Sequence, residues 1–319
     1  MRRQRGRRPP GQGPAPLRQP LRLGGGGTTA AVTPPRISAP DAPRPSRAVR
    51  LVALDLDGTC LDVHQRLAPR TRDAVRATVA GGTTVVVATG RMYRSALPWA
   101  REMGVTAPLL CYQGALVREQ PDRDGAEAGP VLFEDPVDPP AAEDALRIAR
   151  AGGWHYQAYQ DDRLLCEEDR PEAHLYARIA QVEIHFVDDL VPVLRRGSTK
   201  VVCVVDDPVG AARCEAAMRE GLDGRALVTR SLPQFVEITN PLASKGRALG
   251  RLCEHLGVGL DEVVAVGDAP NDSDMLTVAG FSVAVEGAPD RLLVHADAVC
   301  APADHAGVAE VLVALGLAP

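Results

Sequence analysis

The stretch LVALDLDGT, residues 51–59, decides the fold class of this 319-residue chain. Its first half is a short apolar run, which is typical of a buried strand in a parallel sheet. The run ends in Asp55-Leu56-Asp57, and Gly58 then turns the chain into a loop. Open parallel sheets bind ligands just beyond the carboxyl ends of their strands. We therefore expect Asp55 and Asp57 to belong to a ligand site.

Outward from this stretch, predicted helices and apolar strands alternate. On the carboxyl side, the pattern predicts a helix at 69–79, a strand at 83–88, a helix that follows Arg91 and reaches Gly104, and a strand at 108–112. Near the end of the chain it predicts helices from Ser244 to Gly257 and at 271–279, and strands at 262–266, 281–285 and 298–301. Such alternation is typical of the α/β class, with a doubly wound parallel sheet. The sequence therefore predicts a Rossmann-like core built from two pieces of the chain.

Residues 137–239, between these two pieces, follow a different pattern. Helices are predicted near 140–151, 172–181 and 208–220, and strands near 154–159, 163–166, 200–205, 226–229 and 235–238. This mixture predicts an inserted α+β cap domain that lies over the edge of the sheet as a lid. Residues 49–136 and 240–319 would then form the core. We expect residues 1–48 to be a disordered tail, because they hold ten Pro, seven Gly and no apolar periodicity.

Composition excludes several classes of protein. Lys and Arg number 36 against 41 Asp and Glu, and the net charge of −5 averages a basic tail with ten Arg and an acidic body. No stretch approaches the roughly 18 apolar residues of a membrane span. The seven cysteines show neither disulfide nor zinc spacing. We expect a soluble, cytoplasmic protein without a nucleic-acid or membrane partner; the sequence does not indicate an oligomeric state.

Only two of the 36 basic residues are lysines, Lys200 and Lys245. In a chain so rich in arginine, a remaining lysine is a candidate for a specific task. Lys245 begins a predicted helix and joins the polar residues at the sheet edge. Lys200 begins a predicted cap strand, and we expect it to be a surface or edge residue.

A set of polar side chains gathers at the predicted carboxyl edge of the sheet. Its four carboxylates would repel one another without a cation, and oxygen ligands of this kind suit Mg²⁺. Phosphoryl transfer through a covalent intermediate needs a nucleophile, a second acid, a metal and fixed donors for phosphate. An Asp-x-Asp pair alone is also common in solvated turns, so this chemistry depends on the whole set. Its members are Asp55, Asp57, Thr89, Lys245, Asp268, Asn271 and Asp272.

At these residues the sequence resembles a known family, the haloacid-dehalogenase-like phosphohydrolases, and within it the Cof-type phosphatases with a large α/β cap. Four motifs carry the resemblance, in the family's order: LDLDGT at 54–59, ATGR at 88–91, SKG at 244–246 and GDAPNDSDML at 267–276. The resemblance runs from about Arg50 to the C-terminus. One departure is Gln113, which precedes Gly114 where Asn is usual.

The resemblance implies a role for each matching residue. Asp55 would be the nucleophile that becomes an aspartyl phosphate, and Asp57 the general acid and then the base. Asp268 would bind Mg²⁺ beside Asp55 and the backbone carbonyl of Asp57, with Asp272 in support. The residues that would bind phosphate or substrate are Gly58, Thr59, Thr89, Gly90, Arg91, Lys245 and Asn271.

The expected function is hydrolysis of a phosphoric monoester, with Mg²⁺ as cofactor. The substrate would be a small phosphorylated metabolite, such as a sugar phosphate or a phosphorylated cofactor or its precursor, selected by the cap. One alternative is a phosphomutase on the same core, and another is a non-catalytic protein that binds a phosphorylated ligand. A phosphoacceptor signalling domain also groups acids, Thr and Lys at a sheet edge, but it needs no inserted domain.

Overall fold

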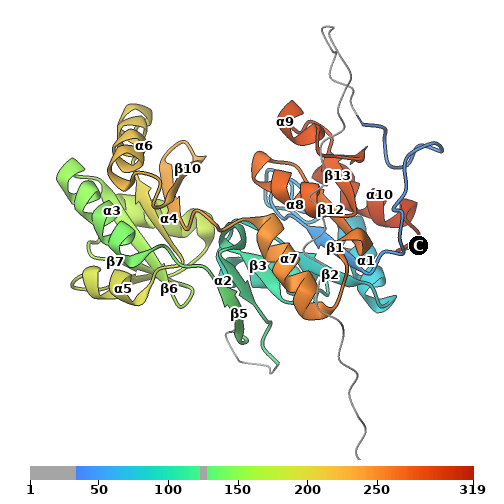
Figure 1. Ribbon diagram of the computed structural model, residues 1–319, viewed down its shortest axis with the longest axis horizontal. Helices are drawn as coiled ribbons and strands as arrows, with labels where there is room; N and C mark the ends of the chain where they lie inside the picture. Colours follow the sequence, from blue (N-terminus) through green and yellow to red (C-terminus); the bar gives the residue numbers. More distant parts are fainter. Residues whose placement is uncertain (1–33, 123–127) are drawn as a thin grey trace, which may run out of the picture.

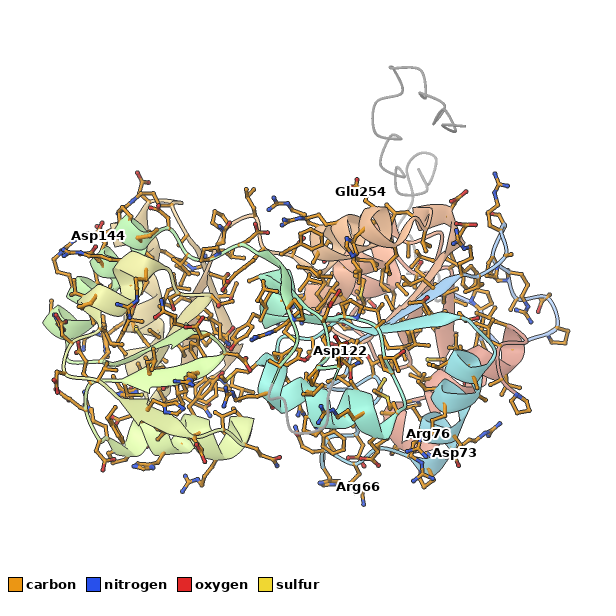
Figure 2. The ribbon with its side chains drawn as sticks, turned by 90° about the horizontal axis from the view of Figure 1, so that it is seen from below. Arg66, Asp73, Arg76, Asp122, Asp144 and Glu254 are labelled. Atoms are coloured by element: carbon orange, nitrogen blue, oxygen red, sulfur yellow. The ribbon has the colours of Figure 1, made fainter. Side chains whose placement is uncertain are left out.

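The computed structural model describes residues 34–122 and 128–319, in which two α/β units lie side by side (Figure 1). One unit, the core, is built on a five-stranded sheet, and the other, the cap, on a six-stranded sheet. Charged side chains such as Asp144 and Glu254 lie on the outside of the units (Figure 2). Among the described residues, no helix combines the length and the apolar character that crossing a bilayer requires.

The core sheet is parallel throughout, with strand order β14-β13-β12-β1-β2. All four residues of β1 are buried because helices cover both faces of the sheet. Val52 and Leu54 pack in the cluster under α1 and α10, and Leu51 and Ala53 pack under α7 and α8. The α/β class predicted from the sequence is thus confirmed. The strands are β1 (Leu51–Leu54), β2 (Thr84–Val87), β12 (Val263–Gly267), β13 (Phe281–Val285) and β14 (Ala298–Cys300).

Four helices of the core, α1, α2, α7 and α8, follow the strands as predicted, whereas α9 and α10 were not predicted. Short 3₁₀ turns lie between the elements. Their bounds are α1 (Pro69–Ala80), α2 (Tyr93–Glu102), α7 (Lys245–Leu256), α8 (Ser273–Val278), α9 (Asp290–Leu293) and α10 (Gly307–Ala314). The 3₁₀ turns are η1 (Tyr112–Gly114), η2 (Leu260–Glu262), η3 (Pro270–Asp272) and η4 (Ala303–His305).

The third predicted strand of the core belongs to another sheet, which corrects the prediction for residues 108–112. β3 (Leu109–Cys111) pairs with β4 (Leu116–Arg118), and β4 pairs with β5 (Val131–Glu134), both antiparallel. Only a single parallel bridge, from Ala88 to Leu110, joins β3 to the end of β2. The strands β4 and β5 were not predicted, because both are short and lie beside loops.

The prediction of a disordered tail at 1–48 was wrong for residues 34–48, and residues 1–33 lie outside the described part. Arg36 forms a parallel bridge to Val299 at the edge of β14, and Ile37 is fully buried. The Arg36 guanidinium binds the Glu310 carboxylate through Nε at 2.8 Å and a terminal nitrogen at 3.0 Å. Arg36 also pairs with Glu286, and Arg47 pairs with Asp261. One buried isoleucine and a few ion pairs therefore anchor this arm, and such isolated contacts leave no periodic pattern in the sequence.

The cap sheet has strand order β10-β11-β9-β6-β7-β8. Apolar residues on one face pack under α3, α5 and α6 and form a separate hydrophobic cluster. The other face packs against α4 and shares a cluster with the core. Two of these elements, β8 and α5, were not predicted from the sequence. The strands are β6 (His155–Gln160), β7 (Arg163–Cys166), β8 (Ile184–Phe186), β9 (Lys200–Val204), β10 (Leu227–Leu232) and β11 (Phe235–Thr239). The helices are α3 (Pro139–Gly152), α4 (Pro171–Ala180), α5 (Val191–Arg196) and α6 (Pro208–Leu222).

Lys200 is buried in the cap, contrary to the prediction of a surface or edge position. Its strand, β9, lies between β11 and β6, and its side chain is only 3% exposed. The ammonium binds Glu237 Oε1 at 3.1 Å and lies over the rings of Tyr112, Tyr159 and Tyr176. Tyr112 belongs to the core, so this network lies where the two units meet.

Candidate active site

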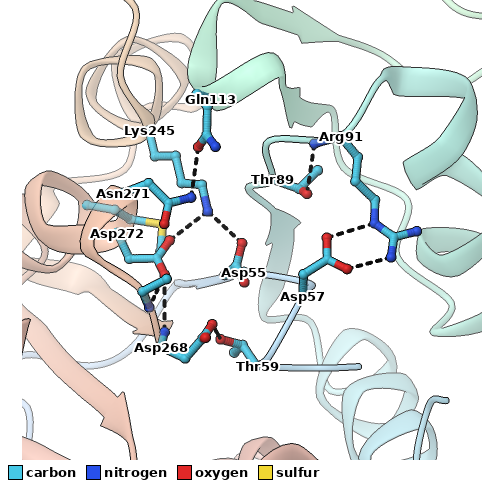
Figure 3. A network of polar contacts seen from close by, with 12 residues as sticks. Asp55, Asp57, Thr59, Thr89, Arg91, Gln113, Lys245, Asp268, Asn271 and Asp272 are labelled. Carbon is cyan, nitrogen blue, oxygen red and sulfur yellow. Dashed lines mark hydrogen bonds and ion pairs between the residues drawn. The ribbon is translucent and has the colours of Figure 1, made fainter. Parts of the chain in front are cut away.

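Asp55 and Lys245 come together from opposite ends of the core sequence. Asp55 follows β1 directly, and Lys245 is the first residue of α7, whose N-cap Ser244 accepts a hydrogen bond from Arg247 N. The Lys245 ammonium lies 2.5 Å from Asp55 Oδ1 and 2.6 Å from Asp272 Oδ1 (Figure 3). Because both lysine and carboxylates are buried, each depends on the others for its charge to be tolerated.

Asp268 and Asp272 lie beside Asp55 and Lys245 in the same site. Both follow β12, and Asp272 Oδ2 accepts hydrogen bonds from the amides of Asp268 and Ala269 at 3.1 Å each. Asp268 Oδ1 accepts one from Thr59 Oγ1 at 2.9 Å. Gly58 has a φ of +88°, and a Cβ at this position would lie 2.2 Å from Asp268 Oδ2. The glycine therefore lets the loop after β1 reach Asp268.

Three carboxylates of this site lie close enough to share one cation. Asp55, Asp268 and Asp272 each offer an oxygen within 4.8 Å of the other two. Burial raises the pKa of Asp268 to about 6, and the nearby Asp272 adds to the shift. Burial also raises the pKa of Asp55 well above its usual value, although Lys245 opposes this shift. Three acids with one lysine leave a surplus of negative charge, and an all-oxygen donor set fits Mg²⁺.

Burial alone would lower the pKa of Lys245, but the carboxylates of Asp55 and Asp272 raise it above its usual value. The ammonium therefore stays protonated at neutral pH. It supplies one fixed positive charge beside Asp55. Lys245 is the first residue of α7, so the positive end of the α7 dipole lies at the same place.

Asp57 stands apart from the three clustered carboxylates. Its side chain is 46% exposed and faces Arg91, whose Nε lies 2.8 Å from Asp57 Oδ2 and whose terminal nitrogen lies 2.5 Å from Oδ1. The same guanidinium also donates to Gln65 Oε1. The Asp57 carboxylate is thus outside the candidate metal cluster, and its backbone carbonyl remains the predicted ligand. Arg91, predicted to bind phosphate or substrate, holds Asp57 in this structure.

Thr89 and Asn271 lie on opposite sides of the Asp55 carboxylate (Figure 3). Thr89 is fully buried after β2, and its Oγ1 accepts a hydrogen bond from Arg91 N at 3.1 Å. That leaves the hydroxyl proton of Thr89 as a donor for a ligand. Asn271 Nδ2 donates to Gln113 Oε1 at 3.0 Å. A Cβ on Gly90 would lie 2.4 Å from Gln113 Nε2, so the Gln113 side chain covers this glycine.

The loop that carries Gln113 has an unusual backbone. Tyr112, Gln113 and Gly114 all have positive φ, at 52°, 58° and 90°. A Cβ on Gly114 would lie 2.2 Å from the carbonyl oxygen of Ser244. Left-handed conformations of bulky residues are costly and cluster at functional sites. This loop therefore belongs with the site, although the sequence marked it only through Gln113.

The structure brings the predicted site residues to one place, at the carboxyl ends of β1, β2 and β12 and the start of α7. Gln65 was missed altogether, since a glutamine in a loop leaves no recognisable signal. Gln113 stood out only as a departure from a motif.

Comparisons with known proteins identify the family of the chain. The sequence model of one family, described as haloacid dehalogenase-like hydrolase, matches residues 52–312. The phosphatase YwpJ of Bacillus subtilis is 27% identical to this chain, over 83% of the chain and 99% of the relative. The HMP-PP phosphatase of Cronobacter sakazakii is 28% identical, over 76% and 86%. The crystal structure of TM0651 from Thermotoga maritima superposes with a TM-score of 0.75 at 30% identity, covering 83% of this chain and 97% of that one.

Proposed function

The chain belongs to the haloacid dehalogenase-like hydrolase family, and from this premise we propose that it is a Mg²⁺-dependent phosphatase acting through an aspartyl phosphate on Asp55. The observation that carries the proposal is the buried cluster of Asp55, Asp268 and Asp272 around Lys245. A nucleophilic carboxylate beside a fixed ammonium, with an excess of oxygen ligands for a cation, is the equipment that phosphoryl transfer requires.

Asp55, Asp268 and Asp272 would hold the Mg²⁺ ion, with the Asp57 carbonyl as a further ligand. Bound there, the ion would neutralise phosphate charge as a Lewis acid. Lys245 reduces the remaining repulsion between the phosphate and Asp55. The Thr89 hydroxyl donates to a phosphate oxygen, and Asn271 orients phosphate or substrate.

In the first step, an oxygen of Asp55 attacks phosphorus, and the bond between phosphorus and the leaving oxygen breaks. Asp57 gives its proton to that oxygen. In the second step, Asp57 takes a proton from water as the water hydrolyses the aspartyl phosphate, releasing inorganic phosphate and restoring Asp55. Asp57 faces Arg91 in this structure, so it must turn toward the substrate to act. Gly58 and Thr59 form the turn that brings the backbone near the phosphate.

The proposed substrate is a small phosphorylated metabolite, such as a sugar phosphate or a phosphorylated cofactor or its precursor. The phosphatase names of YwpJ and of the HMP-PP phosphatase support this class. We propose that residues 137–239, the cap, select the leaving group.

The cytoplasm remains the proposed location, in keeping with seven cysteines that are all free. The absence of nucleic-acid and membrane partners also remains a proposal.

A phosphate-release assay on a panel of phosphorylated metabolites tests this function. We expect Mg²⁺-dependent release that EDTA abolishes and that Asp55→Asn reduces to background. Asp41→Asn, at an exposed position on the arm, is the matched control and should keep full activity. Release that survives in Asp55→Asn would contradict the nucleophile, and phosphate retained on the product would indicate a phosphomutase.

A further inference from the structure

Asp162 of the cap is buried against the core, where it accepts hydrogen bonds from core groups. It lies in the turn between β6 and β7 and is 4% exposed. Its Oδ1 accepts from Tyr93 N at 2.9 Å and from Tyr112 Oη at 2.8 Å. Its Oδ2 accepts from Arg94 N at 2.7 Å and from Arg94 Nε at 3.3 Å. All four donors belong to the core unit.

Two of these donors are the first amides of α2, which lies on the side of the core next to the cap (Figure 1). The N-cap residue of α2, Met92, offers no side-chain hydrogen bond to these amides. The Asp162 carboxylate therefore accepts the hydrogen bonds that an N-cap side chain of α2 would otherwise accept, although it belongs to the other unit. Its negative charge lies at the positive end of the α2 dipole. The helix begins two residues after Arg91, the residue that holds Asp57. A shift of Tyr93 would thus move the loop of Thr89 and Arg91.

Of the other two donors, Arg94 Nε also belongs to α2. The last donor is the hydroxyl of Tyr112, whose φ of 52° is unusual for an aromatic residue. Tyr112 N donates to Arg91 O at 2.9 Å, and Gln113 N donates to Thr89 O at 3.1 Å. The Tyr112 ring packs edge-on against Tyr159 of the cap, with centroids 5.9 Å apart. Contacts from the cap therefore help to hold the loop that positions Gln113, and a conformation of this kind persists only where its surroundings fix it.

The turn itself is built for this contact. Asp161 and Asp162 both have positive φ, at 51° and 58°. Two-residue hairpin turns of this type favour Asn-Gly or Asp-Gly, because glycine adopts positive φ without cost. A second aspartate in place of glycine is unfavourable for the turn alone, and here its carboxylate makes the contacts to the core.

We propose that Asp162 is a positioning residue, which fixes the core loops of Thr89, Arg91 and Gln113 for phosphoryl transfer when the cap is docked. Its hydrogen bonds to the described core residues lead to α2 and Tyr112 rather than to Asp55 or the candidate metal ligands, so it acts through those two elements. The effect on catalysis rests on the proposed phosphatase function, whereas the effect on loop order does not.

Asp162→Asn tests this role with Asp161→Asn as the matched control. Asparagine tolerates positive φ, so both variants keep the turn. With Mg²⁺ and p-nitrophenyl phosphate, we expect kcat of Asp162→Asn to fall by about tenfold or more, and KM to change by less than about threefold. Tyr112→Phe keeps the ring but loses the hydroxyl, and should lower kcat in the same direction. The double variant should lose less than the product of the two single losses.

Hydrogen–deuterium exchange tests the contact of Asp162 with α2 and Tyr112 independently of any activity assay. We expect faster exchange at residues 91–95 and 112–115 in Asp162→Asn and no change in β12 or β13. Wild-type kcat in Asp162→Asn, a rise in KM alone, or unchanged exchange in these segments would overturn the proposal. If Asp162→Asn does not fold, Tyr112→Phe decides by the same measurements. Altered exchange in a chain that hydrolyses no phosphate ester would leave the contact standing and contradict the proposed function instead.

Discussion

The two lysines of this protein are both buried, yet their surroundings differ in charge. In the cap, Lys200 binds Glu237 at 3.1 Å, and three tyrosine rings complete its environment. In the core, Lys245 lies between Asp55 and Asp272, and Asp268 adds a third carboxylate. The cap pair is balanced, whereas the core site has a surplus of acid.

This difference separates a structural ion pair from a site that needs a ligand. A balanced, well-packed pair requires nothing further, and its main effect is on the stability of the cap. A surplus of buried carboxylates is stable only with protons or a cation, and it is poised to bind both metal and phosphate. We therefore expect the two lysines to respond differently to substitution and to Mg²⁺.

The largest effect should follow loss of the core lysine. Lys245→Met leaves the buried carboxylates of Asp55 and Asp272 without their ammonium, beside the partly buried Asp268, so we expect kcat/KM to fall by about 10³-fold. The metal-free variant should also lose more stability than either Lys200→Met or Ile37→Ala. Mg²⁺ should restore part of that stability. Phosphate release measures the effect on activity, and thermal unfolding with and without Mg²⁺ measures the effect on stability. Near-wild-type activity of Lys245→Met would contradict a role for Lys245 in the active site.

Loss of the cap lysine should act on stability instead. Lys200→Met leaves Glu237 buried beside the tyrosines, and we expect a loss of about 3 kcal/mol in the free energy of unfolding. Replacing both partners, as Lys200→Met with Glu237→Leu, should recover most of it. Urea unfolding measures the difference, and Mg²⁺ should not change it. A double variant no more stable than Lys200→Met would show that the pair is not an independent, balanced unit.

A smaller effect should come from the arm at 34–48, which packs on the core alone. Ile37→Ala opens a cavity in the core cluster, and we expect it to cost about 2 kcal/mol. Hydrogen exchange should rise in β14 and α10 and stay unchanged in the cap strands. The matched surface control is Val63→Ala, at a side chain that is 89% exposed. If Ile37→Ala lost no more stability than Val63→Ala, the packing of Ile37 would contribute nothing to the stability of the core.

The smallest effect should be on the stability of the cap at low pH, through the buried His155. Burial lowers the pKa of His155, whose ring lies 3.2 Å from Gln157 Oε1. A lowered pKa in the folded state means that this contribution to stability is present above the ordinary value of about 6.5 and is lost as pH falls below it. We expect His155→Gln to reduce the loss of stability between pH 7 and pH 5, measured by urea unfolding at each pH. Equal pH dependence in the wild type and His155→Gln would contradict this.

Much of the core follows from local sequence patterns. Apolar runs that end in polar motifs identify β1, β2 and β12, and the topology of a parallel sheet then places Asp55, Thr89 and Asp268 near one another. The start of α7 was equally visible, because Ser244 is an N-cap residue and Gly257 ends the helix. The α/β class and the composition of the site could therefore be predicted without coordinates.

What could not be predicted depends on single long-range contacts. The burial of Lys200 follows from the position of β9 inside its sheet, and strand order is not encoded in periodicity. The pairing of Arg91 with Asp57 joins side chains 34 residues apart. The arm at 34–48 packs through Ile37 alone among its large apolar residues, within a segment otherwise typical of disorder. Such contacts arise from tertiary packing, which a reading of local pattern does not contain.

Isothermal titration of Mg²⁺ tests the difference between the two lysine sites most directly. We predict that the wild-type chain binds one Mg²⁺ and that Asp268→Asn weakens binding by at least about tenfold. Glu237→Gln, which alters the balanced cap pair, should bind Mg²⁺ as the wild type does. Equal Mg²⁺ affinity in Asp268→Asn and the wild type, or no binding to either, would contradict the claim that the acid surplus around Lys245 is a metal site.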